Sequence, residues 1–195
     1  MDTNKYIPTV EAIEKASGVL EEILEPTPFQ KNQNLSDIYG ANIFLKREDL
    51  QMVRSYKIRG AYNKIRTIDP ALLKNGIVCA SAGNHAQGVA FSCNKLQIMG
   101  SIFMPTTTPK QKIEQVRMFG REFIDIVLTG DTFDAANSAA IRFAKESGRT
   151  FIPPFDDPKV MEGQGTIGRE ILKQTKEKLD YIFVPIGGGG LASGL

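Results

Sequence analysis

Apolar residues follow two arrangements along this chain: short continuous runs, and longer stretches with helical spacing. The continuous runs predict strands at residues 42–46, 76–80, 98–104, 123–128 and 181–186. Helical spacing predicts helices at residues 9–24, 54–68, 84–96, 109–119, 131–147 and 160–175. Continuous apolar strands that alternate with helices predict an α/β fold, with a parallel sheet covered by helices on both faces.

Several helix ends carry residues that favour them. Thr9 precedes the first helix, and Asp131 or Thr132 opens another, because their side-chain oxygens can accept hydrogen bonds from free backbone N–H groups. Pro109 suits the first turn of the helix predicted at residues 109–119. Gly148 suits the end of the helix predicted at residues 131–147.

In a parallel sheet of this kind, ligands bind beside the carboxyl ends of the strands. Three loops are expected there: residues 81–85, the stretch after Met104, and the glycine run 187–190. We therefore look for the functional residues in and around these loops.

The glycine run from Gly187 to Gly190 follows the last apolar run, and five residues follow it. Because glycines let the backbone approach an anion closely, the run predicts a phosphate-binding loop, the alternative being a tight packing turn. A dinucleotide pattern through Gly187, Gly189 and Ala192 is a weak match, since consecutive glycines satisfy many patterns. Five residues are too few for a stable helix, so we expect the chain to be the front part of an enzyme.

Small residues form the loop before the helix at residues 84–96. Ser81, Ala82 and Gly83 leave room for a ligand, and free N–H groups at the start of a helix suit a carboxylate. The alternative is that Asn84 simply opens the helix. His85 is the only histidine and has no visible acidic partner, so neither a metal site nor a catalytic role is favoured for it.

Lys57 lies near a predicted helix start, between Tyr56 and Ile58. Apolar neighbours and a helix N-terminus disfavour the charged ammonium form of a lysine. Such a lysine can act as an amine nucleophile and form a Schiff base with a carbonyl cofactor, although most lysines are simply solvated.

Three other groups of polar residues have a structural interpretation. The charged run 46–49 is expected to be a solvated strand end. Gln164 and Thr166 could line a site or cap a helix. Cys79 and Cys93 lie in apolar segments and are expected to be buried, reduced thiols.

Composition excludes several classes of function. The net charge of +2 gives no strong field for nucleic acid or a membrane surface. No apolar run is long enough to span a bilayer, and the first residues lack signal-peptide features. A cytoplasmic protein is expected.

A lysine for a Schiff base, a Ser-Ala-Gly-Asn loop for a carboxylate and a tetraglycine loop for a phosphate together supply what pyridoxal phosphate and an amino acid need. The combination resembles the fold-type II pyridoxal-phosphate enzymes (tryptophan synthase beta-like), and among them the threonine dehydratases. The motifs that carry the resemblance lie at residues 46–51, 55–63, 81–88, 130–133 and 163–166. Tyr56 departs from the pattern, since the family more often has Phe before the lysine.

The resemblance implies a role for each site residue. Lys57 would bind the cofactor as a Schiff base and remove the α-proton of the substrate, and Tyr56 would contact the cofactor. Asn84 would hydrogen-bond the ring hydroxyl oxygen of the cofactor. The phosphate would bind Gly187, Gly188, Gly189, Gly190 and Leu191, and the substrate carboxylate would bind Ser81, Ala82, Gly83 and Asn84. No metal is implied.

The implied reaction is loss of water from L-threonine, or from L-serine, with the cofactor phosphate as the acid for the leaving hydroxyl. The products from threonine would be 2-oxobutanoate and ammonia. Residues 53–57 and 104–112 resemble the biosynthetic enzymes that feed isoleucine synthesis. Residues 151–160 are also similar to catabolic serine/threonine dehydratases and serine racemases. A different class remains open: a non-catalytic chain that binds the cofactor or a full-length relative.

The family inserts a small domain into a large one. The resemblance therefore implies a small domain at residues 73–152, with residues 1–72 and 153–195 as part of an incomplete large domain. It also implies that a hydroxyl partner for the pyridine nitrogen and any regulatory domain lie outside this sequence, and that the full-length form is a homo-oligomer.

Overall fold

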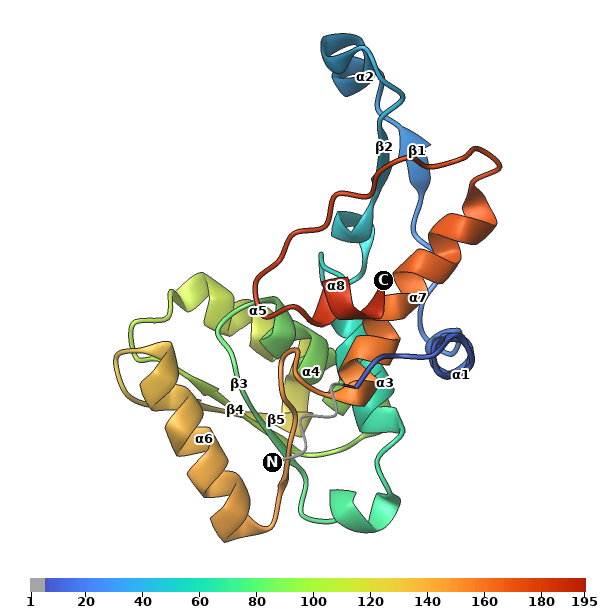
Figure 1. The fold of residues 1–195 in the computed structure, drawn as a ribbon. Helices are drawn as coiled ribbons and strands as arrows, with labels where there is room; N and C mark the ends of the chain where they lie inside the picture. Colours follow the sequence, from blue (N-terminus) through green and yellow to red (C-terminus); the bar gives the residue numbers. More distant parts are fainter. Residues whose placement is uncertain (1–5) are drawn as a thin grey trace.

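The computed structural model describes residues 6–195 and centres on a parallel sheet (Figure 1). Its strands are β3 (Ile77–Ala80), β4 (Gly100–Met104), β5 (Ile124–Leu128) and β6 (Thr150–Phe151), in the order β5-β4-β3-β6. The register pairs Cys79 with Ile102, and Ile102 with Ile126. Three of these strands confirm the apolar runs predicted from sequence, whereas β6 has two residues and is too short for any periodic signal.

Both faces of the sheet are covered by helices, as predicted. Ile77 and Cys79 of β3 pack into one apolar cluster, and Val78 and Ala80 pack into another on the opposite face. Alternate residues of a strand point to opposite faces, so β3 must be apolar throughout. Helices α4 (Asn84–Leu96) and α5 (Lys110–Gly120) supply the first cluster, and α6 (Phe133–Ser147) supplies the second.

The predicted caps are largely confirmed. The Thr9 hydroxyl accepts a hydrogen bond from the backbone of α1 (Val10–Leu20), and Thr132 does the same for α6. Gly148 ends α6 in the left-handed conformation. Helix α1 ends at Leu20 rather than at residue 24, since the next three residues form a turn. Helix α7 (Pro158–Gln174) begins earlier than predicted because Asp157 caps it.

Helix α3 (Lys57–Arg66) lies between α4 and α7 and is shorter than the predicted helix 54–68. It cannot begin at Arg54, whose φ is +59°. Glycines allow its neighbours to approach. A Cβ on Gly88 of α4 would lie 3.1 Å from the Ile58 Cα, and one on Gly163 of α7 would lie 2.7 Å from the Gly60 Cα. The backbone around Lys57 is therefore tightly enclosed.

An antiparallel hairpin projects from this body (Figure 1). Strands β1 (Phe29–Lys31) and β2 (Phe44–Lys46) pair with one another, and α2 (Gln33–Tyr39) lies between them. The rings of Phe29 and Phe44 stack with centroids 5.2 Å apart. Only β2 was predicted, because β1 and α2 are too short for a clear periodic pattern.

The predicted strand at residues 181–186 is wrong. This segment runs over the surface and pairs with no strand among the residues described. Tyr181 is 83% exposed and Phe183 is 93% exposed. An apolar run becomes a strand only where a neighbouring strand accepts its backbone hydrogen bonds, and β1–β6 pair elsewhere. The short helix α8 (Gly190–Gly194) follows the glycine run.

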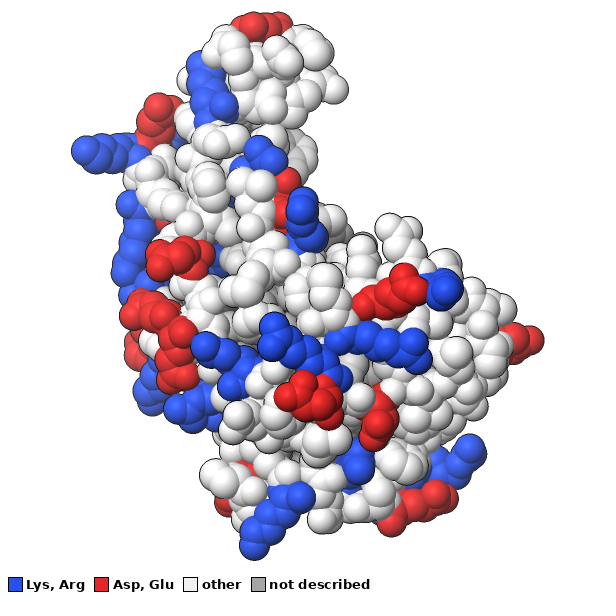
Figure 2. Space-filling view, turned by 180° about the vertical axis from the view of Figure 1, so that it is seen from behind, with Lys and Arg blue, Asp and Glu red and all other residues white. Residues whose placement is uncertain are grey.

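The surface carries mixed charge. Figure 2 shows Lys and Arg side chains interspersed with Asp and Glu, in keeping with the small net charge of +2. Within residues 6–195, none of the helices has both the length and the apolar character needed to cross a bilayer.

Candidate functional site

Lys57 is the first residue of α3, and its side chain is half-buried. Its Nζ donates a hydrogen bond of 2.8 Å to the backbone oxygen of Pro154, in the loop between β6 and α7. The same nitrogen lies 5.5 Å from the centre of the Tyr56 ring. Burial lowers the pKa of Lys57, because desolvation disfavours the ammonium form. This is the environment that the sequence predicted for a nucleophilic amine.

The residue after Pro154 contacts the glycine run. Phe155 packs so closely on Gly188 that a Cβ there would lie 2.3 Å from two of its ring carbons. A Cβ on Gly190 would lie 2.9 Å from the Phe155 oxygen. Two adjacent loop residues, Pro154 and Phe155, therefore connect Lys57 with the glycine run, although Lys57 lies about 130 positions before that run in the sequence.

The glycine run is shaped in a way that only glycine permits. Gly189 has a φ of +84°, which L side chains rarely adopt. Throughout residues 6–195, no acceptor is found for the backbone N–H groups of Gly187, Gly188, Gly189 and Gly190. Free donors on a loop without side chains are what a phosphate requires.

Helix α4, which follows the small-residue loop, packs against the start of α3. Gly88, on the first turns of α4, faces the backbone of Lys57 and Ile58. Ser81 is half-buried, and its hydroxyl accepts a hydrogen bond from the Gly83 N–H at 3.2 Å. The Asn84 side chain is exposed at the start of the helix. With Ala82 also half-buried, the predicted carboxylate loop keeps its small, open character.

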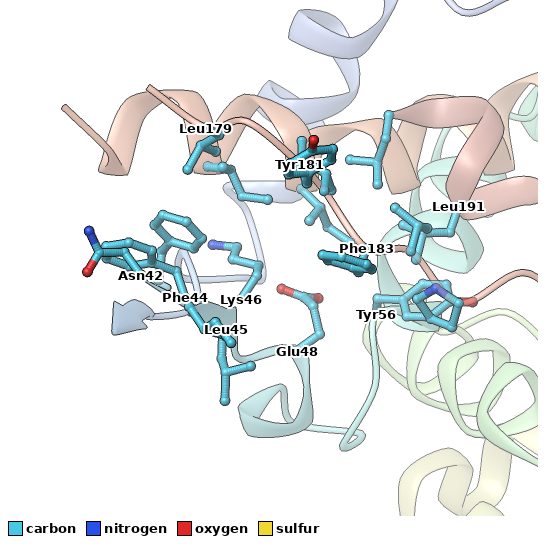
Figure 3. Close-up of a pocket in the computed structure, with 18 residues that line it drawn as sticks. Asn42, Phe44, Leu45, Lys46, Glu48, Tyr56, Leu179, Tyr181, Phe183 and Leu191 are labelled. Atoms are coloured by element: carbon cyan, nitrogen blue, oxygen red, sulfur yellow. The ribbon is translucent and has the colours of Figure 1, made fainter. Parts of the chain in front are cut away.

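A cavity of about 420 Å³ is lined mainly by residues of β2 and of the segment after α7 (Figure 3). Two predicted cofactor residues, Tyr56 and Leu191, line it, while Lys57 does not. Figure 3 shows Phe44 and Lys46 of β2 on one side of it, Phe183 and Tyr56 on the other, and Tyr181 above. The cavity is mostly apolar, and its lining includes none of residues 187–190 or 81–84.

The charged run 46–49 is not the solvated strand end that was predicted. Arg47 and Asp49 do pair with one another at the surface. Lys46 and Glu48 instead point inward, with side chains only 8% and 12% exposed. They join a buried ionic network around Arg59, a residue that sequence reasoning missed. The available signal was its place between Ile58 and Tyr62 on the inward face of α3.

His85 has a structural role. It is buried, and its Nε2 lies 3.1 Å from the backbone oxygen of Ile152, to which the neutral ring donates a hydrogen bond. Burial lowers its pKa to about 4, with a further lowering by the Lys57 charge. The imidazole is therefore neutral at physiological pH, and its low pKa makes it a weak base.

The remaining candidates also have structural roles. Thr166 lies within α7 and accepts a hydrogen bond from Arg59, while Gln164 is buried without a hydrogen-bond partner among residues 6–195. Asp157, not either of these residues, caps the helix. Cys79 and Cys93 are free and buried, as predicted, and burial raises the pKa of both thiols. The described part of the chain holds no cluster of three or more potential metal ligands.

These residues fit a cofactor that carries an aldehyde and a phosphate. A half-buried amine of lowered pKa is available for the aldehyde, at Lys57. Four glycines offer free N–H donors to the phosphate, and Phe155 leaves no room for a side chain at Gly188. The fit rests on the donor groups and on the space around them.

Comparison with known proteins supports the same kind of cofactor. Residues 20–195 match the family model described as pyridoxal-phosphate dependent enzyme. Biosynthetic L-threonine dehydratase IlvA of Halalkalibacterium halodurans is 54% identical over 186 residues, which cover 95% of this chain and 45% of that protein. The chain thus spans about half the length of the curated relatives that it matches.

Solved structures agree with the fold. The processed form of threonine deaminase isoform 2 from Solanum lycopersicum superposes with a TM-score of 0.88 at 44% identity, covering 94% of this chain and 50% of that one. Maize serine racemase superposes with a TM-score of 0.90 at 32% identity, covering 97% of this chain and 56% of that one.

Proposed function

Since the chain belongs to the family of pyridoxal-phosphate dependent enzymes, we propose that it takes part in the dehydration and deamination of L-threonine. The observation that carries the proposal is the hydrogen bond of Lys57 to Pro154, next to the residue that packs on the glycine run. These contacts hold the amine and the glycine run close to one another, which supports the proposal. The fold-type II architecture of the family matches the parallel sheet described above.

Lys57 is the residue that would hold the cofactor aldehyde. Its lowered pKa increases the fraction of neutral amine at physiological pH, and only the neutral amine is a nucleophile or a base. The same nitrogen would take the α-proton of the substrate. When bound, pyridoxal phosphate supplies an electron sink that makes removal of this proton easier.

The loops on either side would orient the cofactor and the substrate. Gly187, Gly188, Gly189, Gly190 and Leu191 would bind the phosphate, with Tyr56 beside the cofactor. Ser81, Ala82, Gly83 and Asn84 would bind the substrate carboxylate, with Asn84 also reaching the cofactor hydroxyl. The exposure of Asn84 and the small side chains before it support access from solvent.

Threonine is favoured as the substrate because the curated relative named above is called a biosynthetic L-threonine dehydratase. The products would be 2-oxobutanoate and ammonia, for isoleucine synthesis. The serine racemase similarity supports a second candidate, racemisation or dehydration of serine. Incubation with each amino acid, followed by detection of 2-oxo acid and of D-serine, separates the two.

The small domain would comprise residues 73–152, with residues 1–72 and 153–195 in the large domain, which fits the confinement of β3–β6 to residues 77–151. The full-length form would be a homo-oligomer. A cytoplasmic location fits two buried cysteines that remain free.

Borohydride reduction tests the function directly. The chain is incubated with pyridoxal phosphate, reduced, digested and mapped by mass spectrometry. We expect the label on Lys57, and turnover of threonine by the same sample or by a full-length form. Label on another lysine would refute Lys57 as the attachment site. Label on Lys57 without any turnover would refute the catalytic proposal and show that the chain only binds the cofactor.

A further inference from the structure

Arg59 is almost completely buried, with its side chain 1% exposed, and all five of its N–H donors are used. Nε and Nη2 donate to the two oxygens of Glu48 at 2.8 and 2.7 Å. Nη1 donates to Glu170 at 2.6 Å and to Thr166 at 3.1 Å, and Nη2 reaches the second Glu170 oxygen at 3.0 Å. A guanidinium is the only side chain that can fill this arrangement.

The network continues to a second cation. Lys46 Nζ donates to Glu170, to the backbone oxygen of Thr27 at 2.7 Å and to Gln174 at 2.8 Å. Two positive and two negative side chains therefore balance one another. Burial raises the pKa of Glu170, but the hydrogen bonds and charges of Arg59 and Lys46 outweigh it and lower that pKa. The pKa of Arg59 is raised by the same carboxylates, so Arg59 and Glu170 hold one another in their charged forms.

Such a network is not explained by stability alone. Burying charges costs desolvation free energy, so a buried ion pair often contributes less than well-packed apolar residues would. The network does fix how the elements that it joins are oriented relative to one another. It joins β2 and the turn after it to α3 and α7 through bonds whose angles are fixed by the guanidinium plane.

Arg59 and Lys57 lie on the same first turn of α3. That turn is enclosed on two other sides by backbone, through Gly88 of α4 and Gly163 of α7. A Cβ on Gly163 would lie 2.7 Å from the Arg59 oxygen. Because backbone already encloses the first turn of α3 on these two sides, the anchored Arg59 side chain limits the movement that remains to it.

We propose that Arg59 is a positioning residue, which through Glu48 and Glu170 fixes the first turn of α3 and thereby the direction of the Lys57 amine. The inference rests on the proposed function, in that Lys57 is taken as the reactive amine. Arg59 does not contact the predicted cofactor loop and acts through Lys57.

The test measures Lys57 without any cofactor. The 195-residue chain is labelled with acetic anhydride across a pH series, and the label on each lysine is quantified by mass spectrometry. Lys110, with its side chain 89% exposed, provides the internal reference. In the native chain we expect the pH midpoint for Lys57 to lie below that for Lys110.

Arg59→Lys keeps the positive charge but loses the planar guanidinium, whose N–H donors bind Glu48 and Glu170 at fixed angles. We expect the Lys57 midpoint to rise by about one pH unit toward that of Lys110, since one unit of pKa is a tenfold change in neutral amine. Borohydride-fixed attachment of pyridoxal phosphate should slow by about tenfold. Arg66→Lys is the matched control: it lies on the same helix in an exposed pair with Glu22, and should leave both values unchanged.

The result counts only for protein that retains its circular dichroism and slow amide exchange in β3. A folded Arg59→Lys chain with an unchanged Lys57 midpoint overturns the proposal. If that variant does not fold, Thr166→Val, which removes one acceptor of Arg59, must raise the midpoint in the same direction, and an unchanged midpoint overturns the proposal equally. Failure of the native chain to attach pyridoxal phosphate would refute the proposed function while the labelling result still decides the role of Arg59.

Discussion

The Lys57 amine, at the start of α3, donates a hydrogen bond of 2.8 Å to the Pro154 carbonyl oxygen, in a loop almost 100 residues later in the sequence. The partner of the amine is a neutral backbone oxygen rather than a carboxylate. A carboxylate would have raised the pKa of the lysine, whereas here burial lowers it. The amine therefore remains available for chemistry while its direction is set.

Replacement of Lys57 tests this arrangement. We expect Lys57→Ala to abolish borohydride-fixed pyridoxal phosphate and to reduce any threonine turnover by about 10²-fold or more, because in the proposed function one group would supply both attachment and proton transfer. Lys64→Ala, on the same helix and paired with Asp157, is the control and should retain attachment. Equal attachment in both variants would show that another lysine binds the cofactor.

The contact of Phe155 with Gly188 makes a second prediction. Gly188→Ala places a Cβ 2.3 Å from the Phe155 ring, so the loop must move, and overpacking of this kind costs about 1–3 kcal/mol. We expect pyridoxal phosphate to bind about tenfold more weakly or worse. Equilibrium titration of the cofactor absorbance measures this.

Two variants show whether that loss has a steric cause. Gly187→Ala adds the same methyl group where no atom lies within 4 Å, and should weaken binding less. Phe155→Ala combined with Gly188→Ala removes the obstructing ring and should recover part of the loss. If the double variant binds no better than Gly188→Ala alone, contact with Phe155 is not what shapes the loop.

Local patterns in the sequence predicted the sheet and its main helices, because their causes are local. Continuous apolar runs and cap residues such as Thr132 and Gly148 act within a few positions. The prediction that the charged run 46–49 is a solvated strand end failed because the cause of its burial is not local. Lys46 is buried only because Glu170, over 120 residues later, neutralises it, and no local pattern contains that information.

The candidate site was predicted in its parts but not in its assembly. Lys57, the small-residue loop and the glycine run were proposed from sequence and remain predictions, and the structure adds Pro154 and Phe155 as the segment that joins two of them. A proline and a phenylalanine in a loop carry no chemical signature, so their role depends on packing alone.

Buried His85 predicts a pH dependence of stability. Its pKa is about 4 in the folded chain and about 6.5 when unfolded, so unfolding takes up a proton between these values and acid favours the unfolded state. The contribution is fully present above about pH 6.5 and is lost as the pH falls toward 4, amounting to about 3 kcal/mol at most. Urea unfolding at several pH values measures it.

His85→Gln provides the comparison, because its amide can still donate to the Ile152 oxygen but does not titrate. The free energy of unfolding of the variant should fall less steeply over the same pH range. Parallel curves for the two proteins would mean that other groups, chiefly carboxylates, cause the whole dependence.

Two glycines should respond in opposite directions to the same substitution. Gly163→Ala forces a Cβ to 2.7 Å from backbone atoms of α3, and we expect a loss of about 1–3 kcal/mol in the free energy of unfolding. Gly18→Ala, on the exposed side of α1 with no atom within 4 Å, should gain about 0.5–1 kcal/mol from helix propensity. Urea unfolding of both variants tests whether α3 and α7 are held in contact; a tolerated Gly163→Ala would show that they can separate.

The exposed apolar segment makes the last prediction. Across residues 6–195, the N–H groups of residues 181–184 and of Ile186 find no backbone acceptor, and Phe183 is 93% exposed, so these amides have nothing to protect them. We expect them to exchange with solvent within the first time point of a hydrogen-exchange experiment. Amides of β3 and β4, paired on both sides and buried, should exchange slowest. Slow exchange at 181–186 that disappears on dilution would mean that a second copy of the chain covers Phe183 in solution. Slow exchange at all concentrations would mean that the segment pairs within the chain, which contradicts the structure.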